Sequence, residues 1–89
     1  MQFTATAYCQ GSVTATGTRP TEGIVAADPK LLPFGTKVRL TGLDARYDGV
    51  YTVRDTGGSI RGHRIDLFIR DCREAVRFGR RPTTVAVVR

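Results

Sequence analysis

Apolar and polar residues alternate along several short stretches of this chain of 89 residues. Alternation with a period of two is typical of half-buried strands, and a short apolar run between turn residues also indicates a strand. These patterns predict six short strands, at residues 2–8, 23–27, 37–40, 49–54, 64–69 and 83–88. The clearest alternation is in the first of them, with Phe3, Ala5 and Ala7 against Thr4, Thr6 and Tyr8.

The segments between the strands are rich in turn-forming residues. Residues 9–22 contain many Gly, Ser, Thr and Pro residues and predict a loop with room for one short strand. Residues 31–36 predict an apolar turn, residues 42–49 a polar hairpin loop and residues 80–82 a turn. Pro29 ends the strand before it, because proline lacks an N–H donor and restricts the residue that precedes it.

One short helix of about two turns is predicted after residue 71. Asp71 is a typical N-cap, and Glu74 follows three positions later, as in a capping box. Gly79 ends the helix. The expected apolar face consists of Ala75, Val76 and Phe78. Six strands and one helix without a repeat predict a single domain over residues 1–89, and a small closed barrel would leave no strand edge exposed.

The formal net charge is +6, and twelve of the fourteen cationic side chains are arginines. Such an excess favours nucleic acid, anionic lipid headgroups or an anionic wall polymer as a partner, although it can also simply keep a domain soluble. Nucleic acid is disfavoured, because basic residues are not interleaved with aromatic stacking residues and no predicted helix is long enough to read a groove. No run of about 18 apolar residues predicts a membrane-spanning helix. Met1 leads directly into a strand pattern, without a signal segment.

The two cysteines are Cys9 and Cys72. Together with the single histidine, His63, they are too widely spaced for a standard zinc site. A disulfide between them would stabilise the fold by about 4 kcal/mol in the chain-entropy model and would require an oxidising compartment. The alternative is two unrelated buried thiols.

Two carboxylates frame the stretch with the richest chemistry, residues 54–67. Asp55 ends one predicted strand, and Asp66 stands inside the next, eleven positions later. If these strands are neighbours, the carboxylates can interact, and one of them can keep its proton near neutral pH. A protonated aspartic acid beside a groove is what the cleavage of a glycosidic bond requires. The alternative is that Asp66 is a structural carboxylate that binds the loop amides around Gly57 and Gly58.

Six short motifs occur in order along nearly the whole chain. They are T-A-Y-C at 6–9, A-T-G-T at 15–18, G-I-V-A-A-D-P at 23–29, L-P-F-G-T at 32–36, V-R-D-T-G-G-S-I-R-G-H-R-I-D-L at 53–67 and E-A-V-R-F-G-R-R at 74–81. With these motifs the sequence resembles the three-aspartate domain, or 3D domain, of bacterial cell-wall proteins. The aspartates that name the family fall at Asp28, Asp55 and Asp66.

The resemblance implies a mainly β fold, a small six-stranded double-psi β-barrel with one or two short helices. The family includes the catalytic domain of membrane-bound lytic transglycosylase A and small stationary-phase survival proteins. The resemblance therefore implies a lytic transglycosylase that cleaves the β-1,4 bond between MurNAc and GlcNAc in peptidoglycan and forms 1,6-anhydro-MurNAc. Asp66 matches the acid–base residue of the family, and Asp55 would assist it. The chain is little more than the barrel, without the second domain of the larger enzyme, and the cysteines are not obligatory family positions.

The remaining candidates are assigned to substrate binding. They are Asp28, Tyr8, Thr18, Gly57, Gly58, Arg61 and His63. Tyr8 and Thr18 would line the groove, and the two glycines would shape the loop and let a ligand approach closely. Arg61 and His63, with Arg64, would bind either carboxylates of the peptide stem or the lactyl ether region. Simpler alternatives are a core position for Tyr8, a turn-forming role for Asp28 and a solvated loop for the basic cluster.

A second interpretation is a non-catalytic module that binds peptidoglycan, because fold does not determine function. In either case the expected partners are peptidoglycan glycan strands, with no nucleic acid, no integral membrane segment, no cofactor and no metal. We expect an extracytoplasmic protein, in the cell wall, the periplasm or secreted, whose signal segment is absent from this chain. A monomer and a strand-exchanged homodimer are both compatible with a small barrel.

Overall fold

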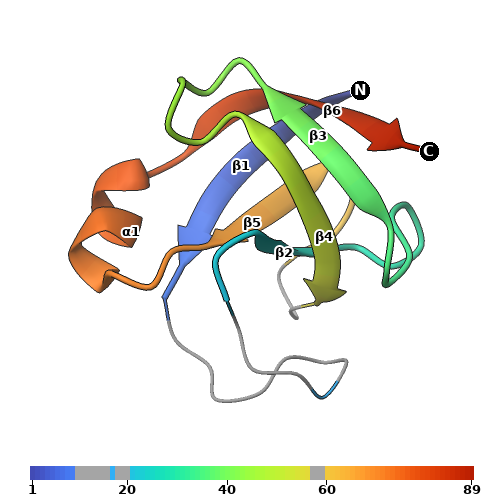
Figure 1. Cartoon of the computed structure of the whole chain (residues 1–89), viewed down its shortest axis with the longest axis horizontal. Helices are drawn as coiled ribbons and strands as arrows, with labels where there is room; N and C mark the ends of the chain where they lie inside the picture. Colours follow the sequence, from blue (N-terminus) through green and yellow to red (C-terminus); the bar gives the residue numbers. More distant parts are fainter. Residues whose placement is uncertain (10–16, 18–20, 57–59) are drawn as a thin grey trace.

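The described residues form six strands in a closed barrel. A short helix lies at one side of the barrel (Figure 1). The computed structural model describes residues 1–9, 17, 21–56 and 60–89. Within these residues the elements are, in chain order, β1 (Gln2–Tyr8), β2 (Ile24–Ala27), β3 (Lys37–Thr41), β4 (Gly49–Asp55), β5 (Arg64–Phe68), α1 (Cys72–Phe78) and β6 (Arg81–Val88). The described part of the chain contains no helix long and apolar enough to cross a membrane.

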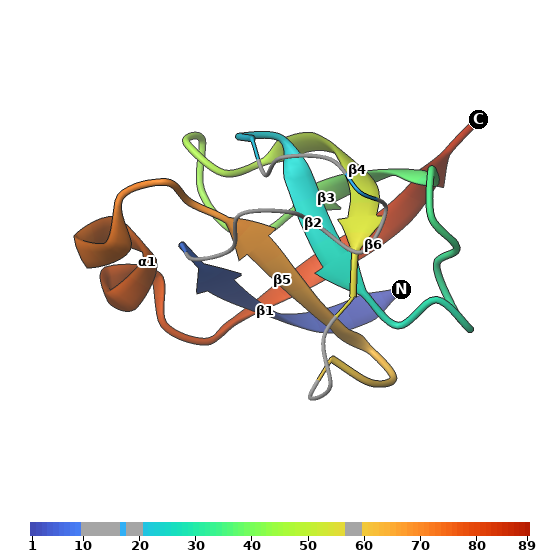
Figure 2. The same ribbon diagram turned by 90° about the horizontal axis from the view of Figure 1, so that it is seen from below.

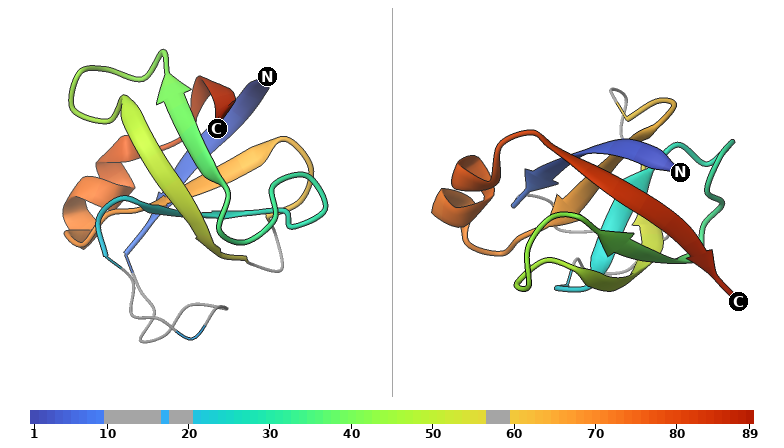
Figure 3. Two further views of the ribbon diagram at one scale, coloured as in Figure 1. Left: turned by 45° about the vertical axis from the view of Figure 1, so that its right-hand side comes forward. Right: turned by 90° about the horizontal axis from the view of Figure 1, so that it is seen from above.

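The strands close into a barrel in the order β1-β5-β2-β4-β3-β6. The pairs β1–β5 and β2–β4 are parallel, and the other four pairs are antiparallel. Each parallel pair joins one strand from the first half of the chain to one from the second, so the two halves interlock, as Figures 2 and 3 show. The expected mainly β, six-stranded double-psi barrel is therefore confirmed, with a single short helix in the described residues.

The barrel interior is filled by apolar side chains from every strand. Its members are Phe3, Ala5, Val25, Ala27, Leu32, Val38, Leu40, Leu43, Val53, Ile65, Leu67, Ile69, Ala75, Phe78 and Val85. A barrel of this size has room for side chains but for no channel. Because successive residues of a strand face opposite sides, the inward positions of Ile65 and Leu67 direct Asp66 to the outer face.

Strand β6 begins at Arg81, two residues before the predicted start. The predicted turn at residues 80–82 is therefore wrong, because Arg81 and Pro82 pair with β1. Pro82 lies opposite Thr4, whose N–H donates to the carbonyl of His63 on the other side of β1. A strand residue directs its N–H and C=O to the same side. The N–H and C=O of Thr4 therefore point away from β6, and no hydrogen bond to Pro82 is needed at this pair. A proline without an N–H is tolerated there.

Helix α1 is capped as expected at its start but buries a different face. The Asp71 carboxylate accepts hydrogen bonds from the amides of Arg73 (2.9 Å) and Glu74 (3.3 Å). The Glu74 side chain does not complete a capping box, because it binds the 42–48 loop instead. Phe78 is buried, whereas Val76 is 79% exposed, so its expected place on the apolar face is wrong. The reason is the 3.6-residue period, which puts only residues three or four positions apart on one face.

Truncation of the two apolar side chains at the end of α1 should therefore differ in its effect. Phe78→Ala should lower the free energy of unfolding by about 3 kcal/mol or more, because it removes a buried ring and leaves a cavity. Val76→Ala should change it by less than about 0.5 kcal/mol, because the side chain is exposed. Urea unfolding followed by circular dichroism measures both. Equal losses would contradict the burial pattern of the helix.

Candidate functional site

Strands β4 and β5 flank β2, and each carries one aspartate at the same level. Ala26 of β2 lies opposite Asp66 of β5 on one side and opposite Asp55 of β4 on the other. On the far side of β5, Thr6 of β1 lies opposite Asp66. Residues opposite each other on paired strands share a face. The four residues form one row across the outer face, which we call the acid row: Thr6, Asp66, Ala26 and Asp55. Strands lie about 4.8 Å apart, so the Cα atoms of the two aspartates are roughly 10 Å apart.

A β-bulge in β4 turns Asp55 to this outer face. In the parallel pair of β2 and β4, Val25 lies opposite Val53. The next residue of β2, Ala26, lies opposite Asp55, so Arg54 is an extra residue in β4. Val53 faces the core, and strict alternation would turn Arg54 outward and Asp55 inward. The bulge resets the alternation, which is a common way to re-aim a side chain beside a functional site.

Asp66 is half-buried, and its carboxyl group is held by one neighbour in the row. The hydroxyl of Thr6 donates to Asp66 Oδ1 at 2.8 Å. Burial raises the pKa of Asp66 above its usual value, and the nearby charge of Asp55 raises it further. The Thr6 hydrogen bond and the charge of Arg64 lower the pKa but do not cancel the effect of burial. The sequence predicted that a second carboxylate would raise this pKa, and the structure adds burial as the larger cause.

Asp55 is held by groups on both of its oxygens. Its Oδ1 accepts a hydrogen bond from the amide of Thr56 (2.9 Å), and its Oδ2 accepts one from the hydroxyl of Tyr8 (3.4 Å). The Tyr8 ring packs edge-on against Phe68, with 5.5 Å between ring centroids. Burial raises the pKa of Tyr8, and the charges of Asp55 and Asp66 raise it further, so Tyr8 remains a neutral hydrogen-bond donor. Tyr8 thus belongs with the two acids and not with the core.

Asp28 has a different environment. Its Oδ1 accepts from the amide of Lys30 (3.0 Å), and its Oδ2 accepts from the amide of Gly62 (2.9 Å). These two hydrogen bonds, that of Gly62 first, lower the pKa of Asp28, and the charges of Arg61 and Lys30 add to the effect. Asp28 therefore remains ionised and joins the turn after β2 to the segment before β5. This geometry corresponds to the turn-forming alternative.

The basic candidates lie toward the start of β5. His63 packs edge-on against Phe3, with 5.0 Å between ring centroids. Since it precedes Asp66 by three residues, it lies about 10 Å away along the strand. Arg61 donates to the carbonyl of Ile60 (3.5 Å) and acts electrostatically on Asp28. Thr18, Gly57 and Gly58 lie outside the described residues.

The two cysteines lie together at the end of β1. Cys9 and Cys72 form a disulfide with an S–S distance of 2.09 Å and a Cα–Cα distance of 5.1 Å. Of the two alternatives left open by the sequence, the structure contains the bridge. It ties the residue after Tyr8 to the first residue of α1, and the carbonyl of Tyr8 also accepts a hydrogen bond from the amide of Ile69 (2.8 Å).

Two members of the acid row, Thr6 and Ala26, were not candidates from the sequence. Two signals could have found Thr6: it opens the T-A-Y-C motif, and it stands two positions before Tyr8, which places both on one face of β1. Ala26 lies in a wholly buried run of β2 and gives no chemical signal. Its small side chain is what separates the two aspartates.

The profile of one protein family, described as the 3D domain, matches residues 23–89. Among curated relatives, cell wall-binding protein YocH of Bacillus subtilis (strain 168) is 36% identical over 97 residues. That match covers 99% of this chain and 32% of YocH.

Solved structures with a similar fold include two lytic transglycosylases. LtgG of Burkholderia pseudomallei matches 90% of this chain and 27% of its own, with a TM-score of 0.70 and 25% identity. MltA of E. coli matches 84% of this chain and 26% of its own, with a TM-score of 0.67 and 18% identity. A further structure of E. coli MltA contains bound chitohexaose and has a TM-score of 0.64, at 17% identity over 86% of this chain and 28% of that one. The chain therefore spans about a third of YocH and about a quarter of these enzymes.

Replacement of Thr6 should change the titration of Asp66. Thr6→Val removes a hydrogen bond that lowers the pKa of Asp66, so this pKa should rise. Thr4→Val, two positions earlier on the same face of β1, is the matched control and should leave it unchanged. NMR detection of the Asp66 carboxyl carbon across a pH series measures the shift. A pKa that stays the same in Thr6→Val would show that the hydrogen bond is not formed.

Asp66→Asn should remove a pH-dependent loss of stability. The folded-state pKa of Asp66 lies above the reference value of 3.8. Its protonation therefore stabilises the fold, and this contribution is complete below about pH 3.8 and is lost as the pH rises through the folded-state pKa. The Tm of Asp66→Asn minus the Tm of the wild type should consequently be more positive at pH 7 than at pH 3. A Tm difference that is the same at both pH values would contradict the burial of this acid.

Proposed function

The chain belongs to the 3D domain family, and from this membership we propose that it is a lytic transglycosylase that cleaves the β-1,4 bond between MurNAc and GlcNAc in peptidoglycan. The observation that carries the proposal is the acid row. It holds a half-buried carboxyl group, Asp66, whose pKa is raised, within electrostatic range of a second carboxylate, Asp55. Glycosidic bond cleavage needs such an acid, because the leaving oxygen must be protonated.

In this mechanism Asp66 is both acid and base. Since Thr6 donates to Oδ1, the proton of the neutral acid is carried by Oδ2 and can be given to the glycosidic oxygen. The bond from that oxygen to the anomeric carbon of MurNAc breaks. The resulting Asp66 carboxylate accepts the proton of the MurNAc 6-hydroxyl as its oxygen bonds to the anomeric carbon. The acid is regenerated, water is not consumed, and the product is 1,6-anhydro-MurNAc.

Asp55 supplies negative charge at the reacting centre. A transition state with oxocarbenium character is stabilised by a fixed carboxylate nearby. The hydrogen bonds from Thr56 and Tyr8 keep the Asp55 carboxylate in place before the substrate arrives. This preorganisation means that the protein need not reorient its dipoles during the reaction. Tyr8 is a positioning residue in this scheme, and Asp28 serves the same purpose for the segment before β5.

A second candidate function is binding of peptidoglycan without cleavage. It is favoured by YocH, which is named a cell wall-binding protein and is 36% identical to this chain. The part of LtgG that matches the chain is only 27% of that enzyme, so most of the enzyme has no counterpart here. Both candidates place the protein outside the cytoplasm, where peptidoglycan is found, and both use the outer face of the barrel.

Incubation with purified peptidoglycan and mass spectrometry of the soluble products tests the proposal. The wild type should release anhydro-muropeptides, and Asp66→Asn should reduce the release by about 100-fold or more, because it removes the general acid. Asp71→Asn is a matched control with the same change of charge, since asparagine is an equally good N-cap. Full activity in Asp66→Asn would refute the assignment. Retention of the protein on the insoluble wall without product would support the binding module.

A further inference from the structure

One loop on the side of the barrel opposite α1 is apolar on its outside. It is the β2–β3 loop, residues 28–36, and it lies across the molecule from the helix in Figures 1, 2 and 3. Leu31 and Phe34 in this loop are each 43% exposed, whereas the other three phenylalanines of the chain are 6% exposed or less. Six residues of the loop are exposed and only one of them is charged: Pro29, Lys30, Leu31, Pro33, Phe34 and Gly35.

The β2–β3 loop is held in one shape by the barrel. The amide of Leu32 donates to the carbonyl of Asp28 at 2.9 Å, and the amide of Gly35 donates to the carbonyl of Val53 on β4 at 2.7 Å. Gly35 has a φ of +89°, in the left-handed region that favours glycine. The side chain of Leu32 is 1% exposed and belongs to the core. The apolar side chains on either side of it are therefore presented to the outside by a fixed backbone.

The charged side chains around this loop are mostly cationic. The two lysines of the chain, Lys30 and Lys37, stand within the loop and directly after it, and both are exposed. Arg61, also exposed, lies near the start of the loop, because the amide of the next residue, Gly62, donates to Asp28 Oδ2 at 2.9 Å. That hydrogen bond is the main cause of the lowered pKa of Asp28, and the charges of Arg61 and Lys30 add to it. Asp28, the one acid of the loop, is thus already satisfied by backbone amides.

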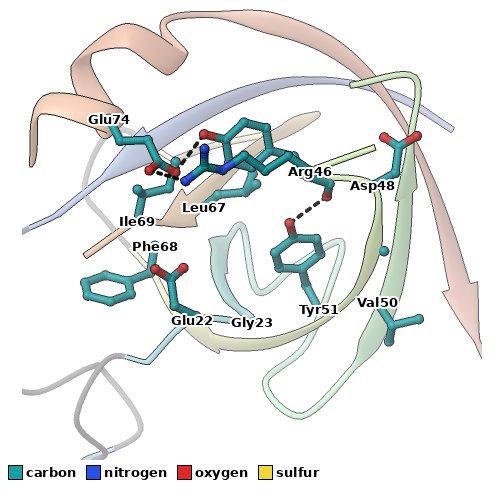
Figure 4. Close-up of a pocket in the computed structure, with 12 residues that line it drawn as sticks. Glu22, Gly23, Arg46, Asp48, Val50, Tyr51, Leu67, Phe68, Ile69 and Glu74 are labelled. Atoms are coloured by element: carbon teal, nitrogen blue, oxygen red, sulfur yellow. Dashed lines mark hydrogen bonds and ion pairs between the residues drawn. The ribbon is translucent and has the colours of Figure 1, made fainter. Parts of the chain in front are cut away.

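The other end of the barrel has the opposite charge. A pocket of about 400 Å³ beside α1 is lined by three carboxylates and one cation (Figure 4), which are Glu22, Asp48, Glu74 and Arg46. An anionic surface is therefore repelled at the end beside α1 and attracted at the β2–β3 loop. This distribution of charge gives the molecule one preferred orientation on such a surface.

We propose that the β2–β3 loop docks on the surface of an anionic phospholipid bilayer. Leu31 and Phe34 enter the boundary between headgroups and acyl chains, and Lys30, Lys37 and Arg61 lie against the lipid phosphates. Apolar side chains surrounded by cations are typical of segments that lie in a membrane interface without spanning it. A neutral glycan is a poorer fit, because it would use the ring of Phe34 but not the three cations.

Docking in this orientation would hold the acid row close to the membrane. Asp28, where the loop begins, follows Ala26 by two residues, which is a distance of about 7 Å along the strand direction. The glycan that reaches Asp66 would then be the part of the wall nearest to the membrane. Docking itself goes beyond the proposed function and does not depend on it.

Tryptophan fluorescence tests the inference, because the chain contains no tryptophan. Phe34→Trp places a single reporter in the loop, and Val76→Trp places one at an exposed position of α1. With vesicles of equal parts phosphatidylglycerol and phosphatidylcholine, the emission of Phe34→Trp should shift to shorter wavelength, because the indole leaves water. The emission of Val76→Trp should stay unchanged, and vesicles of phosphatidylcholine alone should shift that of Phe34→Trp less.

Sedimentation with the same anionic vesicles measures the affinity of further variants. Phe34→Ala should weaken binding at least about threefold, because it removes apolar surface that enters the interface. Lys37→Gln should weaken binding about fivefold, because it removes one cation near the lipid surface. Arg77→Gln makes the same change of charge on α1 and should leave the affinity unchanged.

The inference would be overturned if the emission of Phe34→Trp did not shift, if that of Val76→Trp shifted equally, or if Arg77→Gln lost as much affinity as Lys37→Gln. A shift of Phe34→Trp with chitotetraose but not with vesicles would also overturn it and assign the loop to the glycan. The vesicles contain no sugar, so the result does not depend on cleavage. A chain that docks on vesicles but releases nothing from peptidoglycan would contradict the proposed reaction and leave the docking surface in place.

Discussion

The pairing of β2 with both β4 and β5 is the constraint on which the acid row depends. Ala26 is the point at which the two pairings meet, with Asp55 on one side and Asp66 on the other. A slip of either pairing by one residue would turn a whole strand over and move its aspartate to the opposite face. The same slip would expose Val25 or Leu67, which fill the closed interior. Packing of the core therefore maintains the geometry of the polar site outside it.

The three aspartates of the family motif have different electrostatic environments. Asp28 is stabilised as an anion by two backbone amides, so its pKa is lowered. Asp66 is half-buried with one hydroxyl donor, so its pKa is raised. Asp55 lies between a backbone amide and the phenol of Tyr8. Such a division of environments allows one carboxyl group to hold a proton while another stays charged, which is the requirement of acid catalysis at a glycosidic bond.

Net charge describes this molecule poorly, because the charges are distributed unevenly. The chain carries a net charge of +6, yet three of its eight acidic side chains line one pocket at the end of the barrel beside α1. They are Glu22, Asp48 and Glu74. The arginine that reaches this pocket, Arg46, is paired with Glu74. The net positive charge favours an anionic partner for the protein surface as a whole. One end of the barrel nevertheless carries mostly negative side chains.

The sequence by itself determined the presence of the six strands and the N-cap at Asp71, because each depends on residues within a few positions. The prediction failed at Pro82, whose pairing depends on a strand at the other end of the chain. It also failed at Val76, although the 3.6-residue helical period already places Val76 off the face shared by Ala75 and Phe78. Only the tertiary structure decided that Thr6 and Ala26 join the acid row and that the bulge at Arg54 turns Asp55 outward. Strand register is set by closure of the barrel, which balances all six pairings at once, and no local pattern of residues contains that information.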